Sequence, residues 1–228
     1  MRTATALIGA AGLLAYGAWQ LSRQSQSQAP AAQNTPTWTD QASGVLASAG
    51  QTTAELIDRA TGGILQLSDM AKVTEADLGN PNVQAMLHVI RSGEGTLGPN
   101  GYRMLFGGGL FTSFADHPRI AVQRKTSTGG VITSTAAGAY QALASTWDET
   151  AQIMHLPDFS PHSQDLFAVG RIAARGALAD VEAGRFDVAI TKIAREWASM
   201  PGSPYGQPVI SWNQARAEYQ QAGGVMTA

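Results

Sequence analysis

One change of pattern, at Glu94, constrains the fold of this chain more than any other feature. Before it, Met86, Val89 and Ile90 recur at helical spacing, which predicts an apolar helix ending at the Gly-Glu-Gly sequence. After it, residues 98–135 form short apolar runs broken by glycine, which is typical of a small antiparallel sheet with loops. Helical spacing then returns. The sequence therefore predicts a mostly helical α+β domain with a small sheet between its first two helices.

Capping residues and proline mark the ends of several expected helices. Asn80 or Asn82 is suited to cap the helix that leads to Glu94, with Pro81 in its first turn. Ser160 followed by proline predicts the start of another helix. The helices expected after the sheet span about 140–147, 161–175, 186–199 and 208–222.

The N-terminus begins with an 18-residue run without a charged residue, from Ala4 to Leu21, flanked by Arg2 and Arg23. This length is just sufficient to cross a bilayer. Three interpretations fit it: a retained single-span anchor, an export signal that stays uncleaved or leaves the bilayer later, and a signal cleaved after about Gly17. We assign residues 1–24 to a transmembrane anchor or uncleaved signal.

Two segments separate this run from the main domain. Residues 25–39 are rich in glutamine, serine and proline, and they lack the apolar residues that would offset the entropy of ordering, which predicts a flexible linker. Residues 40–80 include an apolar stripe at 3–4 spacing from Ile57 to Ala71, which predicts a helical extension that packs on the main domain or on a second copy. The alternative is a helix that lies on a membrane surface. The main domain is assigned to residues 81–228.

The composition argues against several kinds of functional site and partner. The 228 residues include no cysteine, which excludes disulfides, thiol catalysis and cysteine metal sites. Fifteen basic and seventeen acidic residues give a net charge of −2, which argues against a nucleic-acid partner. The four histidines show no metal-ligand spacing, so neither a metal nor another cofactor is expected; they are His88, His117, His155 and His162.

Glu94 is the strongest candidate for chemistry in the chain. The C-terminus of a helix carries partial negative charge, which disfavours a carboxylate and raises its pKa. A carboxyl group that keeps its proton near neutral pH is suited to general acid catalysis. The alternative for such a residue, taken alone, is a solvated glutamate at a helix end.

A set of motifs in a fixed order gives a family resemblance. Residues from about 84 to 224 resemble the lambda-phage endolysin family, a lysozyme-like group of peptidoglycan lytic transglycosylases. The family has glycine where this chain has Ala136, and arginine where it has Ala139. The resemblance is carried by Ser-Gly-Glu-Gly-Thr at 92–96 and by stretches at 108–112, 116–119, 134–141, 158–165, 175–178, 197–202 and 205–207.

The resemblance implies a two-lobed lysozyme-like domain and cleavage of the β-1,4 bond between N-acetylmuramic acid and N-acetylglucosamine. Glu94 aligns with the family's catalytic acid, and a transglycosylase that forms a 1,6-anhydro sugar needs only this one carboxyl group. A glycosidase working by hydrolysis needs two. Asp116 is the nearby second candidate, but Asp-His-Pro is more typical of a turn, and His117 is expected to be a packing residue.

Four further residues are predicted to bind substrate by the same resemblance. Tyr140 and Gln141, expected to open the second helix, match a Gly-x-x-Gln segment that lines the cleft opposite the acid. Tyr205 and Gln207 match the family's second lip of the cleft. An aromatic ring stacks on a sugar face and an amide bonds an N-acetyl group. The alternatives are a core position for Tyr140, a surface position for Gln141 and a plain exposed loop for the other two.

Together these features predict a phage or prophage murein-degrading enzyme whose partners are peptidoglycan strands and the bacterial inner membrane. Its catalytic domain is expected in the periplasm, tethered by the N-terminal helix, or in a virion. The role is either release of progeny or wall penetration during entry. Two alternatives remain: a hydrolytic muramidase, and an inactive peptidoglycan-binding structural protein of a virion.

Overall fold

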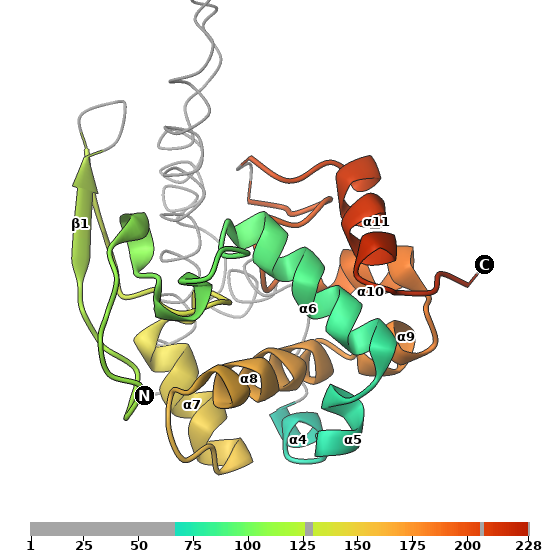
Figure 1. The fold of residues 1–228 in the computed structure, drawn as a ribbon, viewed down its shortest axis with the longest axis horizontal. Helices are drawn as coiled ribbons and strands as arrows, with labels where there is room; N and C mark the ends of the chain where they lie inside the picture. The colour runs from blue at the N-terminus through green and yellow to red at the C-terminus, as the bar shows by residue number, and fades with distance from the viewer. Residues whose placement is uncertain (1–66, 126–129, 206–207, 228) are drawn as a thin grey trace, which may run out of the picture.

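The structure, a computed structural model, describes residues 67–125, 130–205 and 208–227 (Figure 1). Within these ranges the chain forms short and medium helices and one antiparallel hairpin. The helices are α4 (Leu67–Met70), α5 (Glu75–Leu78), α6 (Pro81–Glu94), α7 (Ala144–Met154), α8 (Pro161–Ala174), α9 (Leu178–Glu182), α10 (Phe186–Ile193) and α11 (Trp212–Gln221), with 3₁₀ turns η1 (Gly101–Arg103) and η2 (Phe106–Gly108) and strands β1 (Val122–Lys125) and β2 (Val131–Ser134).

Helix α8 is the centre of the helical part. It packs against α4, α5, α6, α7 and α9. Most of its side chains are buried, as expected for a helix with neighbours on all sides. Ser160 caps it by accepting a hydrogen bond from the Ser163 N–H, and Pro161 occupies its first position, which confirms the predicted start. The helix ends at Ala174, one residue before the expected end.

The small sheet lies to one side of the helices (Figure 1). Strands β1 and β2 pair antiparallel, with Val122 opposite Ser134. The predicted mostly helical α+β class with a small antiparallel sheet is therefore confirmed. The apolar runs at 101–106 and 110–114, however, form 3₁₀ turns and isolated bridges rather than strands. Their glycines explain this difference, because Gly107 and Gly108 have positive φ angles that break an extended strand.

Several expected helix boundaries differ from the structure. The helix expected from residue 140 begins at Ala144, because the preceding residues form a turn with positive φ at Gly138 and Gln141. The helix expected at 186–199 ends at Ile193, and residues 194–199 form irregular turns held by tertiary contacts. The short helix α9 was not expected. The last helix lies within its predicted range.

The helices before α6 belong to the same packed body as the rest. α4 and α5 contact α8, Met70 is fully buried, and Leu78 is part of the main core. The core therefore extends N-terminal of residue 81.

Three predicted segments, the anchor at 1–24, the linker at 25–39 and most of the extension at 40–80, lie outside the described residues. None of the helices in the described ranges is long and apolar enough to span a membrane.

Candidate active site

Helix α6 carries Glu94 into the interior. Asn80 caps the helix through its side chain, which accepts hydrogen bonds from two backbone N–H groups, and Pro81 is its first residue. Met86 and Ile90 are completely buried. Because residues four apart lie on one face of a helix, Glu94 follows them on the buried face. Gly95 ends the helix in the left-handed conformation, with a φ of 71°.

The carboxyl group of Glu94 is enclosed rather than solvated. The residue is only 1% exposed, so the solvated alternative is wrong. The Ser199 hydroxyl donates a hydrogen bond to Oε1 over 2.7 Å. Oε2 is buried and has no hydrogen-bond partner among the described residues. One carboxyl oxygen is therefore anchored and the other is unsatisfied.

This enclosure raises the pKa of Glu94 from its ordinary value of 4.5 to about 8. Burial is the main cause, because a low-dielectric environment disfavours the charged form. The hydrogen bond from Ser199 favours the carboxylate and therefore lowers the pKa, against the larger effect of burial. The direction agrees with the expectation from the helix terminus, but the cause is desolvation. At neutral pH the group keeps its proton.

Glycine at position 93 permits the contact between Glu94 and Ser199. A Cβ atom built on Gly93 would lie 2.3 Å from Met200 Cε and 2.7 Å from Ser199 Oγ. These distances are shorter than any van der Waals contact. A side chain at residue 93 would have to displace these atoms, so glycine lets the end of α6 approach the segment that carries Ser199.

The turn at residues 138–141 lies beside the end of α6. The Thr96 hydroxyl donates to the Ala139 carbonyl over 2.5 Å, which joins this turn to the residues just after Glu94. The Gln164 side-chain oxygen accepts from the Ala139 N–H over 2.8 Å. Gly138, with a φ of 79°, allows this close approach, because a Cβ atom there would lie 2.3 Å from that oxygen. The structure thus brings the Gly-x-x-Gln turn to the candidate acid.

Tyr140 is a core residue. Its side chain is 3% exposed, and its hydroxyl donates to Asp165 Oδ1 over 2.6 Å. The expectation that its ring is free to stack on a sugar is therefore corrected: the ring packs in the interior. The turn directs it inward because residue 140 precedes the helix instead of opening it.

Gln141 has a strained backbone conformation, and hydrogen bonds hold its side chain in place. Its φ of 48° lies in the left-handed region, which is unfavourable for a side chain other than glycine. Its amide nitrogen donates to the carbonyls of Gly138 and Met104, over 2.9 and 3.3 Å. Its Oε1 is buried and unpartnered in the described part of the chain. The side chain is buried, which contradicts a surface position.

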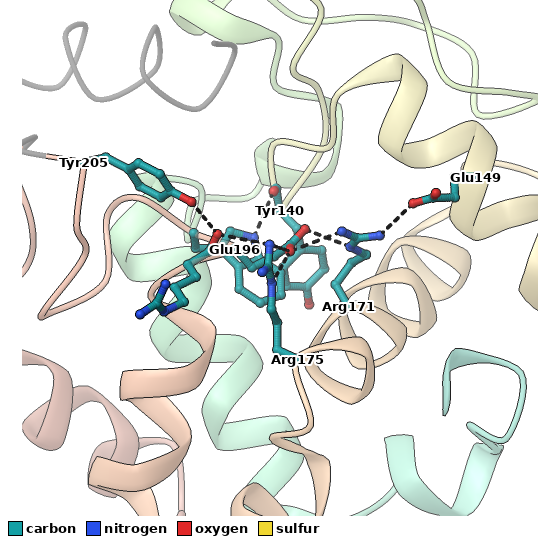
Figure 2. A network of polar contacts seen from close by, with 8 residues as sticks. Tyr140, Glu149, Arg171, Arg175, Glu196 and Tyr205 are labelled. Atoms are coloured by element: carbon teal, nitrogen blue, oxygen red, sulfur yellow. Dashed lines mark hydrogen bonds and ion pairs between the residues drawn. The ribbon is translucent and has the colours of Figure 1, made fainter. Parts of the chain in front are cut away.

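The loop after Ser199 is fastened through Tyr205. The Tyr205 hydroxyl donates to the Arg195 carbonyl over 2.8 Å, and Arg175 donates to the same carbonyl over 3.1 Å (Figure 2). Tyr205 is half-buried, so it is not a plain exposed loop residue. Gln207 lies outside the described residues.

A buried ion network supports the same segment. Glu196 lies between two arginines: Arg171 Nε is 2.7 Å from Oε1, and Arg175 Nε is 2.8 Å from Oε2 (Figure 2). Arg171 also pairs with Glu149 over 3.2 Å. The arginines hold the pKa of Glu196 below its usual value against the effect of burial. This carboxylate therefore stays ionised and already has two partners.

The side chains of Asp116 and His117 stabilise the local turn through hydrogen bonds. The Asp116 carboxylate accepts from the His117 N–H and the Trp147 indole, over 2.7 and 3.1 Å, and pairs with Arg119 over 2.7 Å. His117 Nδ1 accepts from the Arg119 N–H, which leaves Nε2 to donate to the Ala142 carbonyl. Both residues therefore have the structural role expected from the sequence. Across the described ranges, no three His, Asp or Glu side chains gather as metal ligands.

Sequence patterns alone did not indicate Ser199 or the ion network as parts of the site. Ser199 stands in the Trp-Ala-Ser-Met-Pro-Gly stretch that carried part of the resemblance, which was the available signal. Arg171 lies on a helix whose other residues are mostly small and apolar, and a charge in such a pattern suggests a buried partner. Neither signal identifies the partner, because 105 residues separate Ser199 from Glu94.

Comparison with known proteins agrees with the resemblance. The sequence profile of the Endolysin family matches residues 84–226. The endolysin of Escherichia phage lambda is 39% identical over 127 residues, which cover 56% of this chain and 78% of that protein. The endolysin of Escherichia phage P2 is 38% identical over 156 residues, or 63% of this chain and 94% of that one.

Two solved structures share the fold. Bacteriophage lambda lysozyme in complex with a chitohexasaccharide has a TM-score of 0.60 and 37% identity, and the match covers 65% of this chain and 97% of that chain. Lysozyme from bacteriophage lambda has a TM-score of 0.58 and 36% identity over the same shares. At this level of identity the match confirms the lysozyme-like fold predicted for the main domain.

Proposed function

The chain belongs to the endolysin family, and from this premise we propose that it cleaves peptidoglycan by lytic transglycosylation. A lysozyme-like, murein-degrading activity follows from the family and the fold. The proposal adds the type of reaction: an internal attack within the substrate that yields 1,6-anhydro-N-acetylmuramic acid ends in place of hydrolysis.

The reaction needs one carboxyl group that works first as an acid and then as a base. Glu94, protonated at neutral pH, donates its proton to the oxygen that bridges the two sugars, and the bond from this oxygen to the anomeric carbon breaks. The C6 hydroxyl of the same muramyl residue attacks the anomeric carbon, and its proton passes to the Glu94 carboxylate. The carboxyl group is regenerated and no water is consumed.

The observation that carries the role of Glu94 as the acid in this proposal is its unsatisfied oxygen. A buried polar atom without a partner costs about 1–3 kcal/mol, so native structures rarely keep one without a reason. A protonated Oε2 needs a hydrogen-bond acceptor, and the bridging oxygen of a glycan supplies one.

The engagement of Asp116 and Glu196 by other groups supports an internal attack over hydrolysis. A hydrolase needs a second carboxylate to activate water or to form a covalent intermediate. Asp116 is engaged by its own turn and by Arg119, and Glu196 is neutralised by two arginines. Neither is free to act as a base or nucleophile.

The proposed substrate contacts involve Gln141, Tyr205 and Gln207. Gln141 offers its unpartnered Oε1 to the N–H of an N-acetyl group, and Tyr205 and Gln207 are proposed to contact the glycan, as the family resemblance implies. Tyr140 holds the turn through Asp165 and is proposed to position Gln141 without contacting the sugar. The lambda lysozyme bound to a chitohexasaccharide supports a glycan at this site. Because Glu94 is covered, glycan binding requires the side chains over it to move apart.

Digestion of purified sacculi tests the proposal. The wild-type protein should release muropeptides with 1,6-anhydro ends, identified by mass spectrometry, and Glu94→Gln should release none. The control is Glu75→Gln, which removes a charge from an exposed glutamate and should leave the digestion unchanged. Muropeptides with reducing ends would show a hydrolytic muramidase, and clearing by Glu94→Gln would refute the assignment of the acid.

The proposal extends to the place of action. The uncharged run from Ala4 to Leu21, with an arginine on each side, supports a tether to the inner membrane and a catalytic domain in the periplasm. Fractionation of expressing cells tests this tether. The full chain should be recovered with the membranes, and the chain without residues 1–24 should be recovered in the soluble fraction. Detection in purified particles would instead support a role in entry.

A further inference from the structure

We infer that Ser199 is a positioning residue for Glu94, whose hydroxyl fixes Oε1 and leaves Oε2 as the oxygen that holds and delivers the proton. The inference rests on the proposed function, because it assigns tasks to the two oxygens of the proposed acid. Ser199 does not contact the reacting atoms; it acts through Glu94.

The geometry separates the two oxygens of the carboxyl group. Oε1 accepts the Ser199 hydroxyl hydrogen over 2.7 Å, whereas Oε2 has no partner among the described residues. A hydroxyl hydrogen that points at Oε1 makes this atom the acceptor of the group. The carboxyl proton therefore belongs on Oε2, the only oxygen without a donor directed at it. The Glu94 side chain is thus held in one orientation with its proton toward the unoccupied side.

The segment that carries Ser199 has no regular secondary structure to hold it. Residues 194–199 follow α10 as irregular turns, which keep isolated backbone hydrogen bonds, such as the one from the Trp197 N–H to the Ile193 carbonyl over 3.0 Å, but no continuous helical ladder. Side chains from elsewhere take this role. Glu196 is clamped by two arginines, the Trp197 indole donates to the Tyr140 carbonyl over 3.3 Å, and the Ser199 carbonyl accepts from Ile210 over 2.9 Å.

The end of α6 fits this segment closely from the other side. Gly93 leaves no room for a side chain between α6 and Ser199, since a Cβ atom there would lie 2.7 Å from Ser199 Oγ. The hydroxyl is therefore confined between the helix and its own anchored backbone. Such confinement keeps a hydrogen bond directed at one oxygen, and a surface serine would rotate instead.

Charged groups on the surrounding elements are engaged elsewhere. Arg91, one turn before Glu94, contacts the hydroxyl of Tyr102 and the carbonyl of Thr96. Glu218 on α11 pairs with His88 over 2.9 Å. Glu196 has its arginines, and Asp180 on α9 pairs with Lys192 and Arg185. Ser199 is thus the only hydrogen-bonding group in the described ranges that acts on the Glu94 carboxyl.

The test is the pH profile of sacculus clearing at low substrate concentration, which reports the acid of the free enzyme. Activity should fall as pH rises through the pKa of Glu94, because the acid loses its proton. Loss of the Ser199 hydroxyl removes a bond that favours the carboxylate. Ser199→Ala should therefore move this alkaline limb upward by about one pH unit, since a hydrogen bond to a charged group is stronger than one to a neutral group. Its maximal rate should fall at the same time.

Two further variants separate positioning from packing. Ser199→Thr keeps a hydroxyl and should return the limb to its wild-type position. Ser134→Ala removes another buried serine, whose oxygen accepts from the Ala136 N–H, and should leave the limb in place. Should Ser199→Ala fold poorly, Ser199→Cys, with a weaker donor of similar shape, should move the limb in the same direction by less.

An unchanged limb in a folded Ser199→Ala or Ser199→Cys protein, with only a lower rate, would overturn the inference and leave Ser199 as a packing residue. Failure of the proposed function gives a different result, because Glu94→Gln would then still clear sacculi.

Discussion

Removal of the carboxyl group of Glu94 should stabilise the folded protein. The pKa of this group is about 8 in the folded state and 4.5 ordinarily, so the unfolded chain releases a proton that the folded protein retains. Its contribution to stability is fully present below about pH 4.5 and is lost as pH rises through about 8. Glu94→Gln has no proton to release and should avoid this loss.

The size of the effect follows from the pKa difference. Each pH unit between the two values lowers the free energy of unfolding by about 1.4 kcal/mol. At pH 7 the loss is about 3 kcal/mol, from the 2.5 units above 4.5, and above pH 9 it levels off near 5 kcal/mol, from the full shift to about 8. Below about pH 4 the difference should vanish, because both states are then protonated.

Urea unfolding between pH 4 and 9 measures the difference in the free energy of unfolding between Glu94→Gln and the wild type. Trp147 and Trp197 are buried and serve as fluorescent reporters. The gain of Glu94→Gln over the wild type should grow with pH along the expected slope. Glutamine keeps an oxygen for the Ser199 hydroxyl, so this hydrogen bond should survive the substitution. Glu75→Gln controls for the loss of a negative charge as such.

A pH-independent difference between Glu94→Gln and the wild type would refute the reasoning, because it would mean that Glu94 is not held in its neutral form by burial. A substitution that destabilises the protein more at pH 8 than at pH 5 would also refute it. The expected result would show that the acid is kept at a cost in stability.

Two other substitutions test the surroundings of the site. Glu196→Ala removes the buried carboxylate that two buried arginines share, leaving Arg171 only its pair with Glu149, and should lower the free energy of unfolding by about 3–5 kcal/mol, measured by thermal or urea unfolding; a loss below 1 kcal/mol would contradict the ion network. Gly138→Ala forces a Cβ atom against Gln164 at a positive φ and should cost about 1–3 kcal/mol and slow sacculus clearing, whereas Gly98→Ala, with open space around it, should be neutral for both.

Local sequence signals determined the main elements of the catalytic domain. The start of α6 at Pro81, its end at Glu94 and the start of α8 at Pro161 follow from caps, proline, glycine and apolar spacing within a few residues. Such signals are readable because a helix is made of contacts between residues three and four apart. The ordered motifs likewise identified the family and its candidate acid without any tertiary information.

Elements without strong local signals were decided by packing. Apolar spacing continued past Ile193, but the tertiary contacts of Glu196 and Trp197 end α10 there. Tyr140 was expected at a helix start, yet positive φ angles around it form a turn that buries its ring. Helical propensity is a weak preference that such contacts override.

The chemistry of Glu94 shows the same division most clearly. The sequence alone determined that a carboxyl group stands at the end of an apolar helix. Only the tertiary structure decided that it is enclosed, that Ser199 holds one oxygen and that its pKa is raised to about 8. The physical reason is that desolvation depends on every segment packed around a group, and these segments are distant in the chain.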